Sequence, residues 1–142
     1  VMSNRTFYNE VLTDHNIHPE NKFKIKDFTF EKEGVNPSCG DDIVLQIKYE
    51  DGVITDAAFV GEGCAISQAS TDIMTSLVKG KTKEEALRLS DIFLRMIKGE
   101  ASEDEIQELE EGSALEDISH MPARVKCAVL GWRTLNEILK ES

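Results

Sequence analysis

The stretch IVLQIKYEDGVITDAAFV, residues 43–60, decides the fold of this chain. Its first half places every second residue on one apolar face, which predicts a half-buried β-strand with the face Ile43, Leu45, Ile47 and Tyr49. Asp51-Gly52 predicts a tight turn, because aspartate and glycine tolerate the positive φ angles that a two-residue hairpin loop requires. Val53–Val60 is therefore expected to return beside the first strand as its antiparallel partner.

A helix and a third strand are expected before this hairpin. The alternation in Lys24–Phe30 predicts the strand. Further upstream, apolar residues recur at spacings of three and four, which predicts a short amphipathic helix over Arg5–Asn16 that ends near His18-Pro19. The residues of that apolar stripe are Phe7, Tyr8, Val11 and Leu12.

After the hairpin, the apolar period changes to that of α-helices. One helix is expected from Gly63 to Lys79, a second from Thr82 to Gly99, and a last one from Pro122 onward. Thr82 and Glu85 have the spacing of a capping box. The predicted buried stripes are Ile66, Ala69, Ile73 and Leu77; Ala86, Leu89, Phe93, Met96 and Ile97; and Val125, Val129, Trp132, Leu135 and Leu139.

The segment from Ala101 to Ser119 is strongly acidic and has few apolar anchors, so one short helix and a mobile connection are expected there. No internal repeat or second domain is evident. The pattern as a whole predicts a single domain over residues 1–142. Its class is α+β, with a three-stranded antiparallel sheet packed against several helices.

Charge and cysteine content limit the partners and the compartment. The chain has 27 acidic and 16 basic residues, and its formal net charge of −11 repels nucleic-acid phosphates and anionic lipid head groups. We therefore expect neither a nucleic acid nor a membrane as a partner. Three cysteines are an odd number in a chain that needs no disulfides, and no apolar run is long enough to span a membrane, so a reducing, cytoplasmic location is expected.

The three cysteines have separate settings that are each expected to favour the thiolate. Cys39 lies in a turn beside Gly40, Cys64 begins a helix, and Cys127 follows Arg124 by three residues on the last helix. Together with Asp41, three thiolates are a natural ligand set for zinc, and their softness also suits iron–sulfur chemistry. On residue types alone, ordinary free cysteines remain an alternative. His15 and His18 are expected to cap the first helix or to contact solvent, and His120 is expected to lie outside the site.

Four quoted segments together resemble the SufU-type members of the IscU/NifU N-terminal family. They are the opening FYNEVLTDHNIHPENK, NPSCGDDI around Cys39, GEGCAIS around Cys64 and RVKCAVLGW around Cys127. The resemblance covers nearly the whole chain and implies one α+β domain that serves iron–sulfur cluster assembly. It also implies a zinc ligand set of Cys39, Asp41, Cys64 and Cys127, with Cys39 accepting persulfide sulfur from a SufS-type cysteine desulfurase.

Two departures from the IscU scaffolds favour the SufU branch. Those scaffolds have a histidine directly before the third cysteine, within an L-P-P-V-K segment, whereas here Lys126 precedes Cys127 in the run MPARVKC. The acidic segment at about 101–120 also resembles the insertion that distinguishes SufU from IscU proteins.

The first hypothesis is therefore a zinc-dependent sulfurtransferase. Cys39 leaves the zinc to attack the persulfide, Arg124 positions the desulfurase or steadies the leaving thiolate, and the sulfur passes to a downstream Suf-type cluster scaffold. The second hypothesis is a scaffold on which a [2Fe–2S] cluster is assembled on the same ligands. The third is a binding module in which zinc only holds the fold together.

Overall fold

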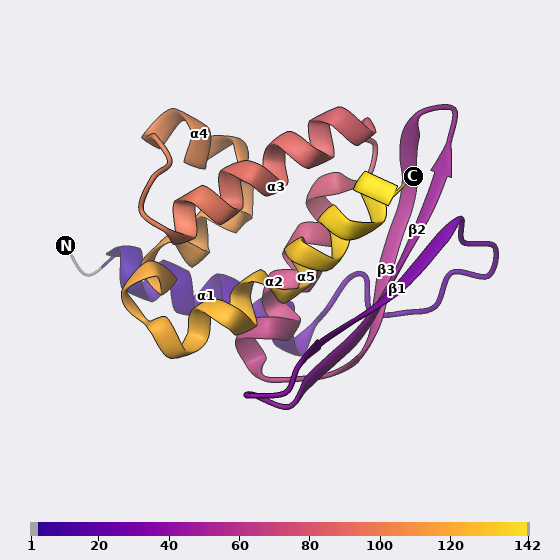
Figure 1. Cartoon of the computed structure of the whole chain (residues 1–142). Helices are drawn as coiled ribbons and strands as arrows, with labels where there is room; N and C mark the ends of the chain where they lie inside the picture. The colour runs from indigo at the N-terminus through magenta and orange to yellow at the C-terminus, as the bar shows by residue number, and fades with distance from the viewer. Residues whose placement is uncertain (1–2, 142) are drawn as a thin grey trace.

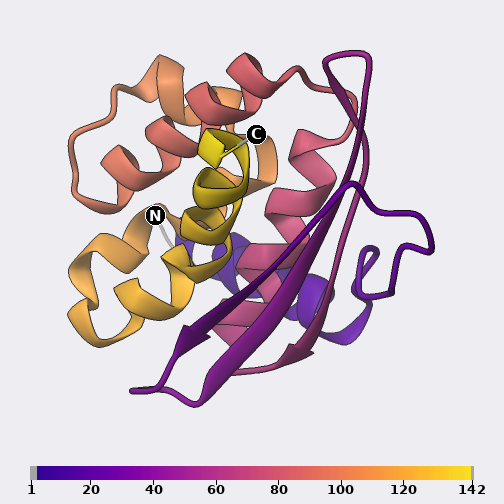
Figure 2. The same cartoon turned by 45° about the vertical axis from the view of Figure 1, so that its right-hand side comes forward.

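A three-stranded antiparallel sheet, in the order β1-β2-β3, is covered on one face by helices (Figures 1 and 2). The computed structural model describes residues 3–141, and the side chains of residues 10–141. The elements are α1 (Ser3–Ile17), β1 (Phe30–Asn36), β2 (Asp41–Glu50), β3 (Val53–Glu62), α2 (Ala65–Val78), α3 (Lys83–Ile97), α4 (Glu103–Glu108), the 3-10 helix η1 (Glu110–His120) and α5 (Pro122–Glu141). This architecture confirms the predicted α+β class.

The central hairpin forms as the sequence predicts. Glu50 pairs with Val53 across a two-residue turn, in which Asp51 has φ 52° and Gly52 has φ 79°. Both angles are positive, as this type of turn requires. Of the predicted apolar face of β2, Ile43, Leu45 and Ile47 are each at 0% exposure and Tyr49 is half-buried.

The predicted first strand is wrong in position. The strand is Phe30–Asn36, so of the expected Lys24–Phe30 only Phe30 belongs to it. Ile25 is buried because its loop is anchored to the sheet, where its backbone N–H donates to Gln46 Oε1 at 2.7 Å. The alternation around Ile25 therefore belongs to an anchored loop. The strand itself carries exposed Glu31 and Glu33, and such charges are common on edge strands, where they oppose pairing with other chains.

The helices α2 and α5 cross the sheet and form the centre of the core with α3. Trp132 of α5 is fully buried and stacks on Phe93 of α3, with ring centroids 4.2 Å apart. A Cβ on Gly131 would lie 2.6 Å from Thr71 Oγ1, so α2 and α5 approach closely only because glycine occupies this position. The stripes predicted for the three helices are mostly buried, and the capping box of Thr82 and Glu85 is present. The side chains of Phe7 and Tyr8, predicted on the stripe of α1, lie outside the described residues.

The acidic segment is more ordered than expected. The predicted short helix is α4, but the expected mobile connection is the 3-10 helix η1. Leu109, Leu115 and Ile118 are each at 0% exposure, so a few apolar side chains fix the segment to the core while the acidic ones face solvent. The spacing of these anchors was not that of an α-helix, which is why the sequence pattern missed the element.

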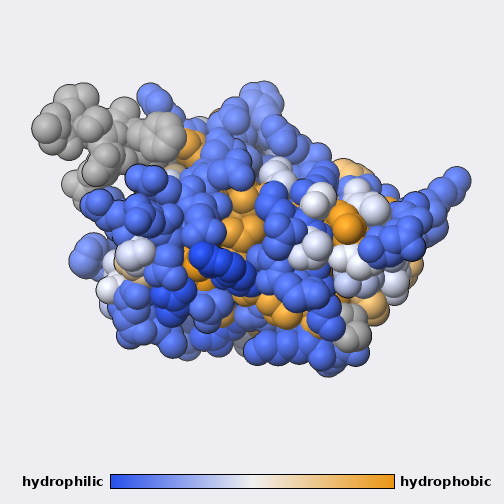
Figure 3. All heavy atoms as spheres, turned by 90° about the horizontal axis from the view of Figure 1, so that it is seen from above, coloured by the Kyte–Doolittle hydropathy of each residue, from blue (hydrophilic) through white to orange (hydrophobic). Residues whose placement is uncertain are grey.

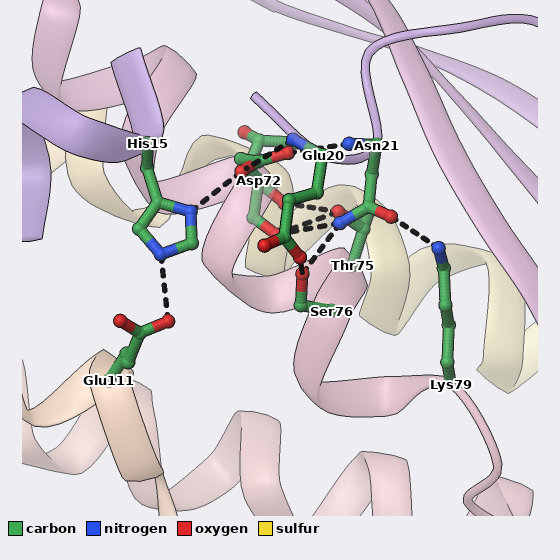
Figure 4. A network of polar contacts seen from close by, with 9 residues as sticks. His15, Glu20, Asn21, Asp72, Thr75, Ser76, Lys79 and Glu111 are labelled. Atoms are coloured by element: carbon green, nitrogen blue, oxygen red, sulfur yellow. Dashed lines mark hydrogen bonds and ion pairs between the residues drawn. The ribbon is translucent and has the colours of Figure 1, made fainter. Parts of the chain in front are cut away.

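A buried polar network joins α1, α2 and η1 (Figure 4). His15 is only 4% exposed; its Nδ1 lies 2.6 Å from Asp72 Oδ2 and its Nε2 lies 2.8 Å from Glu111 Oε1. The expectation that His15 caps its helix or contacts solvent is therefore wrong. Burial disfavours the imidazolium, but the hydrogen bonds to Asp72 and Glu111 outweigh it and raise the pKa of His15 above 6.5. Asp72 also accepts hydrogen bonds from the backbone N–H groups of Glu20 and Asn21.

The face of the molecule shown in Figure 3 is mainly hydrophilic. Seen from above, hydrophilic side chains cover most of the molecule, and hydrophobic ones are visible only as separate patches between them (Figure 3). None of the helices within residues 3–141 combines the length and apolar character needed to cross a lipid bilayer.

Candidate metal centre

Three segments that are distant in the sequence meet at one end of the molecule. They are the turn between β1 and β2 and the junction of β3 with α2, both at the lower end of the sheet in Figures 1 and 2, and the first turns of α5, where Cys127 contacts Cys39 of the turn. Each segment carries one of the three cysteines. One ligand atom each from Cys39, Asp41 and Cys127 lies within 4.8 Å of the others. The structure thus brings three of the four expected ligands into one group.

Cys39 lies on the exposed side of this group. It occupies the turn at residues 37–40, where its backbone N–H donates to the Asn36 carbonyl at 3.2 Å. Gly40 follows with φ 70°, a left-handed conformation that favours glycine and that reverses the chain into β2. The sulfur of Cys39 lies 2.9 Å from that of Cys127, yet its side chain remains open to solvent. A reactant can therefore approach Cys39 from outside.

Cys64 is the N-cap residue of α2, as the sequence predicts. Its sulfur accepts a hydrogen bond from the backbone N–H of Ser67 at 3.4 Å. The side chain is half-buried and lies outside the group of three within 4.8 Å, but its sulfur is near enough to affect the pKa of Cys127. Since the helix N-terminus favours a negative charge, Cys64 is a suitable fourth donor at the edge of the group.

Asp41 is the fixed centre of the group. It is fully buried, and its Oδ1 accepts a hydrogen bond from the backbone N–H of Cys64 at 2.8 Å. Its Oδ2 lies 3.4 Å from Nδ2 of Asn36. The carboxylate has room because residue 63 is a glycine. A Cβ at this position would lie 2.7 Å from Oδ1. Asp41 therefore ties the start of β2 to the start of α2.

Cys127 is buried, and its environment opposes the expected thiolate. Burial is the main cause that raises the pKa of the Cys127 thiol, and the neighbouring Cys39, Cys64 and Asp41 raise it further. The expectation that this position by itself favours the thiolate is wrong. A cation bound between these groups reverses the effect, because a metal ion deprotonates the thiol that coordinates it. Three sulfur donors and one carboxylate oxygen fit the tetrahedral preference of zinc.

Arg124 lies on the surface of the molecule, in the same helix as Cys127. It sits in the first turn of α5, one helical turn before Cys127, and its side chain is exposed. Its backbone N–H donates to the Met121 carbonyl at 2.8 Å. No ion pair of its guanidinium is present among the residues with described side chains. The role of Arg124 remains a prediction.

Two residues of the centre were missed in the sequence. Asn36 ends β1 and is 7% exposed, and Gly63 makes room for Asp41. A polar residue before a proline and a glycine in GEG are both ordinary signs of a turn, so only the distances show what they contact. Among the residues with described side chains, no histidine belongs to the group within 4.8 Å, and His15 belongs instead to the network with Asp72.

The fold and the centre together define a class of protein: a small α+β domain with a thiol-rich candidate metal site at one end of its sheet. The chain belongs to the family described as the NifU-like N-terminal domain, whose model matches residues 7–128. The resemblance noted from the sequence is thus confirmed at the level of the family.

Relatives with different names match almost the whole chain. The chain is 42% identical over 132 residues to a zinc-dependent sulfurtransferase SufU of Bacillus subtilis, which covers 93% of this chain and 88% of the relative. It is 41% identical over 135 residues to an iron–sulfur cluster assembly scaffold protein IscU of Streptococcus pyogenes, covering 95% of this chain and 84% of the relative.

A solved structure has the same fold. It is that of a putative iron–sulfur cluster assembly scaffold protein for the SUF system from Fervidobacterium islandicum, with a TM-score of 0.84 and 36% identity. The match covers 95% of this chain and 98% of that one. It extends over the whole single domain described above.

Proposed function

We propose that this protein is a zinc-dependent sulfur acceptor in iron–sulfur cluster assembly, taking persulfide sulfur from a SufS-type cysteine desulfurase. One observation carries the proposal: the sulfur of the solvent-exposed residue Cys39 lies 2.9 Å from the sulfur of the buried residue Cys127, and the nearby Asp41 is also buried. The site has one sulfur that a partner can reach and further donors that hold their positions. The SufU name of the Bacillus relative supports the choice of zinc and of sulfur transfer.

The four ligands have separate roles in this proposal. Cys64 caps a helix, Cys127 lies within one and Asp41 begins a strand, so these three would hold the metal. Cys39 lies on a turn that ends in Gly40, so it would be the ligand free to react. A bound zinc ion would supply positive charge that stabilises a thiolate ligand such as Cys39.

The transfer step is an exchange at sulfur. The Cys39 thiolate attacks the terminal sulfur of the desulfurase persulfide, a new S–S bond forms on Cys39, and the S–S bond of the donor breaks. The donor cysteine leaves as a thiolate, so charge and electrons balance. Arg124 faces solvent at the same end of the molecule, where it is suited to contact the desulfurase or to steady the departing thiolate. A downstream Suf-type cluster scaffold then receives the sulfur from Cys39.

The whole chain takes part as one domain over residues 1–142. Segment 101–120, which forms α4 and η1, is the proposed insertion of the SufU branch, and its apolar anchors attach it to the same core. We place the reaction in the cytoplasm, whose reducing conditions keep three free cysteines available.

A second candidate function is a scaffold for a [2Fe–2S] cluster on the same ligands. The IscU name of the Streptococcus relative favours it, and three thiolates with one carboxylate also suit iron. The two functions differ in the metal that the protein holds and in the fate of the sulfur.

Metal analysis and sulfur mapping test the proposal together. Protein purified without added metal is expected to contain one zinc per chain and to stimulate desulfurase turnover. After incubation with desulfurase and cysteine, mass spectrometry is expected to find the added sulfur on the Cys39 peptide, and Cys39→Ser to lose it. Sulfur on Cys127 instead, or a coloured iron–sulfur species with little zinc, would reject the proposal in favour of another nucleophile or of the scaffold.

A further inference from the structure

We infer that Asn36 is a positioning residue of the metal centre, whose side-chain amide holds Asp41 and Cys127 in place as ligands. It is the last residue of β1 and is 7% exposed. Its Nδ2 lies 3.4 Å from Asp41 Oδ2 and 3.9 Å from Cys127 Sγ. The inference rests on the proposed function only in taking these two residues as metal ligands.

The backbone places Asn36 where it can act on both ligands. It pairs with Asp41 across β1 and β2, so the two side chains start from neighbouring positions of the ladder. Its carbonyl also accepts a hydrogen bond from the backbone N–H of Cys39. One residue therefore contacts three of the four proposed ligands, one through its backbone and two through its side chain.

The chemistry of the amide matches its neighbours. Its NH₂ group has two hydrogens to donate, whereas the carboxylate of Asp41 and the thiolate of a metal-bound Cys127 can only accept. A donor shared between two anionic ligands lowers their repulsion and orients their lone pairs. Such outer contacts commonly change metal affinity by roughly 10–100-fold when they are removed.

Asp41 is then held on both oxygens. The backbone N–H of Cys64 holds Oδ1 at 2.8 Å and Asn36 holds Oδ2. A carboxylate has about four lone-pair directions, so each oxygen keeps one for a cation. The carboxylate is thus oriented before any metal arrives.

Two substitutions separate donation from packing. Asn36→Asp keeps the size of the side chain but replaces the donor by an acceptor, whereas Asn36→Ala removes the side chain and adds no charge. If Asn36 acts as a donor, zinc affinity measured against a competing chelator falls in both variants, and it falls further in Asn36→Asp, by roughly 10–100-fold. If the residue only fills space, Asn36→Ala is the worse of the two.

Gln46→Glu is the matched control. Gln46 is a buried amide of β2, 4% exposed, whose Nε2 donates to Glu31 at 2.7 Å. The substitution also replaces an amide by a carboxylate, but five residues along β2 from Asp41, which is about 17 Å at about 3.4 Å per residue. It is expected to lower the free energy of unfolding while leaving zinc affinity unchanged.

The visible absorption spectrum of the cobalt-substituted protein reports the ligands around the metal and does not depend on the free energy of unfolding. Asn36→Asp is expected to change the visible bands of the bound Co²⁺, and Gln46→Glu to leave them as in the wild type. Unchanged affinity and spectrum in Asn36→Asp, or a gain in affinity, would overturn the inference, as would an equal loss in Gln46→Glu. A wild-type protein that binds zinc but takes up no persulfide sulfur would contradict only the proposed function. The zinc affinities of the Asn36 and Gln46 variants would still decide the role of Asn36.

Discussion

At the scale of single residues, the candidate centre combines two cysteines whose sulfurs are in contact but whose exposure to solvent differs. Cys39 is open to solvent, while Cys127 is 3% exposed. The exposed one can meet a partner, and the buried one is protected from reagents. Their separation of 2.9 Å between sulfurs also has a consequence for the metal-free protein.

Removal of the metal is expected to leave Cys39 and Cys127 prone to oxidation as a pair. With a mild thiol oxidant such as diamide, the two thiols lose two protons and two electrons and form one disulfide. Peptide mapping of the chelator-treated protein should find Cys39 linked to Cys127, with Cys64 free. The zinc-loaded protein is the control and should react far more slowly. A disulfide from Cys64 would contradict the expectation that the two sulfurs 2.9 Å apart react with each other.

Arg124→Ala is expected to lower desulfurase turnover by roughly tenfold or more, because a charge-assisted contact buried on docking contributes about 1.5–3 kcal/mol. Zinc content and fold should stay as in the wild type, since an exposed helix position tolerates alanine. Arg133→Ala is the matched control, with the same change in charge at another exposed position of α5. Turnover measured for both variants decides the matter, and equal loss would show an effect of net charge alone.

Gly63→Ala is expected to weaken zinc binding by pushing the Asp41 carboxylate out of place, because the new Cβ would lie 2.7 Å from Oδ1. The loss should be about tenfold or more in chelator competition, as for other changes around metal ligands. Gly34→Ala is a control that crowds Thr134 on α5 instead. It should lower thermal stability and leave the zinc affinity close to that of the wild type.

The sequence predicts where the cysteines of the candidate centre lie in the chain's turns and helices, but it does not predict their burial or their contacts with distant segments. The positions of Cys39 in a turn and of Cys64 at a helix start follow from neighbouring glycines and from the helical period, which are local signals. The burial that raises the pKa of Cys127 depends on segments far away in the chain, so no local pattern reports it. The same holds for Asn36, whose side-chain contacts are set by the pairing of β1 with β2.

At the scale of elements, His15 links α1 to α2 and η1, and this link depends on pH. In the folded state its pKa is raised, so the stabilisation is fully present below the unfolded pKa of about 6.5 and is lost as pH rises through the folded value. The groups that face His15 are Asp72 from α2 and Glu111 from η1. The charged imidazolium donates to both of them.

His15→Gln is therefore expected to destabilise the protein most at low pH. The free energy of unfolding of wild type and variant, both with zinc bound, should differ most below about pH 6.5, and the difference should shrink as pH rises above that value. Glu111→Gln should reproduce part of this loss with the same direction in pH. A difference that grows as pH rises would show that His15 is neutral in the folded protein.

Elements were predictable where their local pattern agreed with the tertiary contacts. The hairpin and the helices α2, α3 and α5 have clear periods and were found. The strand β1 was misplaced because it is an edge strand with few apolar residues, and Gly34 rather than a large side chain faces α5. The 3-10 helix η1 was missed because three scattered leucine and isoleucine anchors have no regular period.

At the scale of the whole molecule, the candidate metal centre joins three distant segments that the core already holds in place. Apolar side chains from the sheet and from α1, α2, α3, η1 and α5 form one continuous cluster, which includes the Cys127 side chain but not that of Asp41. The protein is thus expected to stay folded without metal, unlike a zinc finger.

Chelation should consequently lower the melting temperature without unfolding the chain at room temperature. A ligand at one hundred times its Kd stabilises by about 2.7 kcal/mol, which corresponds to roughly 5–15 °C for a domain of this size. Far-UV circular dichroism and calorimetry with and without chelator test this. Complete loss of helical signal on chelation would instead favour the third hypothesis, in which zinc only holds the fold together.

The stacking of Trp132 on Phe93 provides an intrinsic fluorescence signal from the core of the protein. Trp132 is the only tryptophan in the sequence, and its Nε1 donates to Ser70 Oγ at 3.1 Å. Because its indole contacts α2, α3 and α5 at once, its emission reports whether those helices remain packed together. It lies about one and a half helical turns after Cys127 on α5, so fluorescence followed during metal exchange can distinguish a local change at the ligands from a loosening of the core.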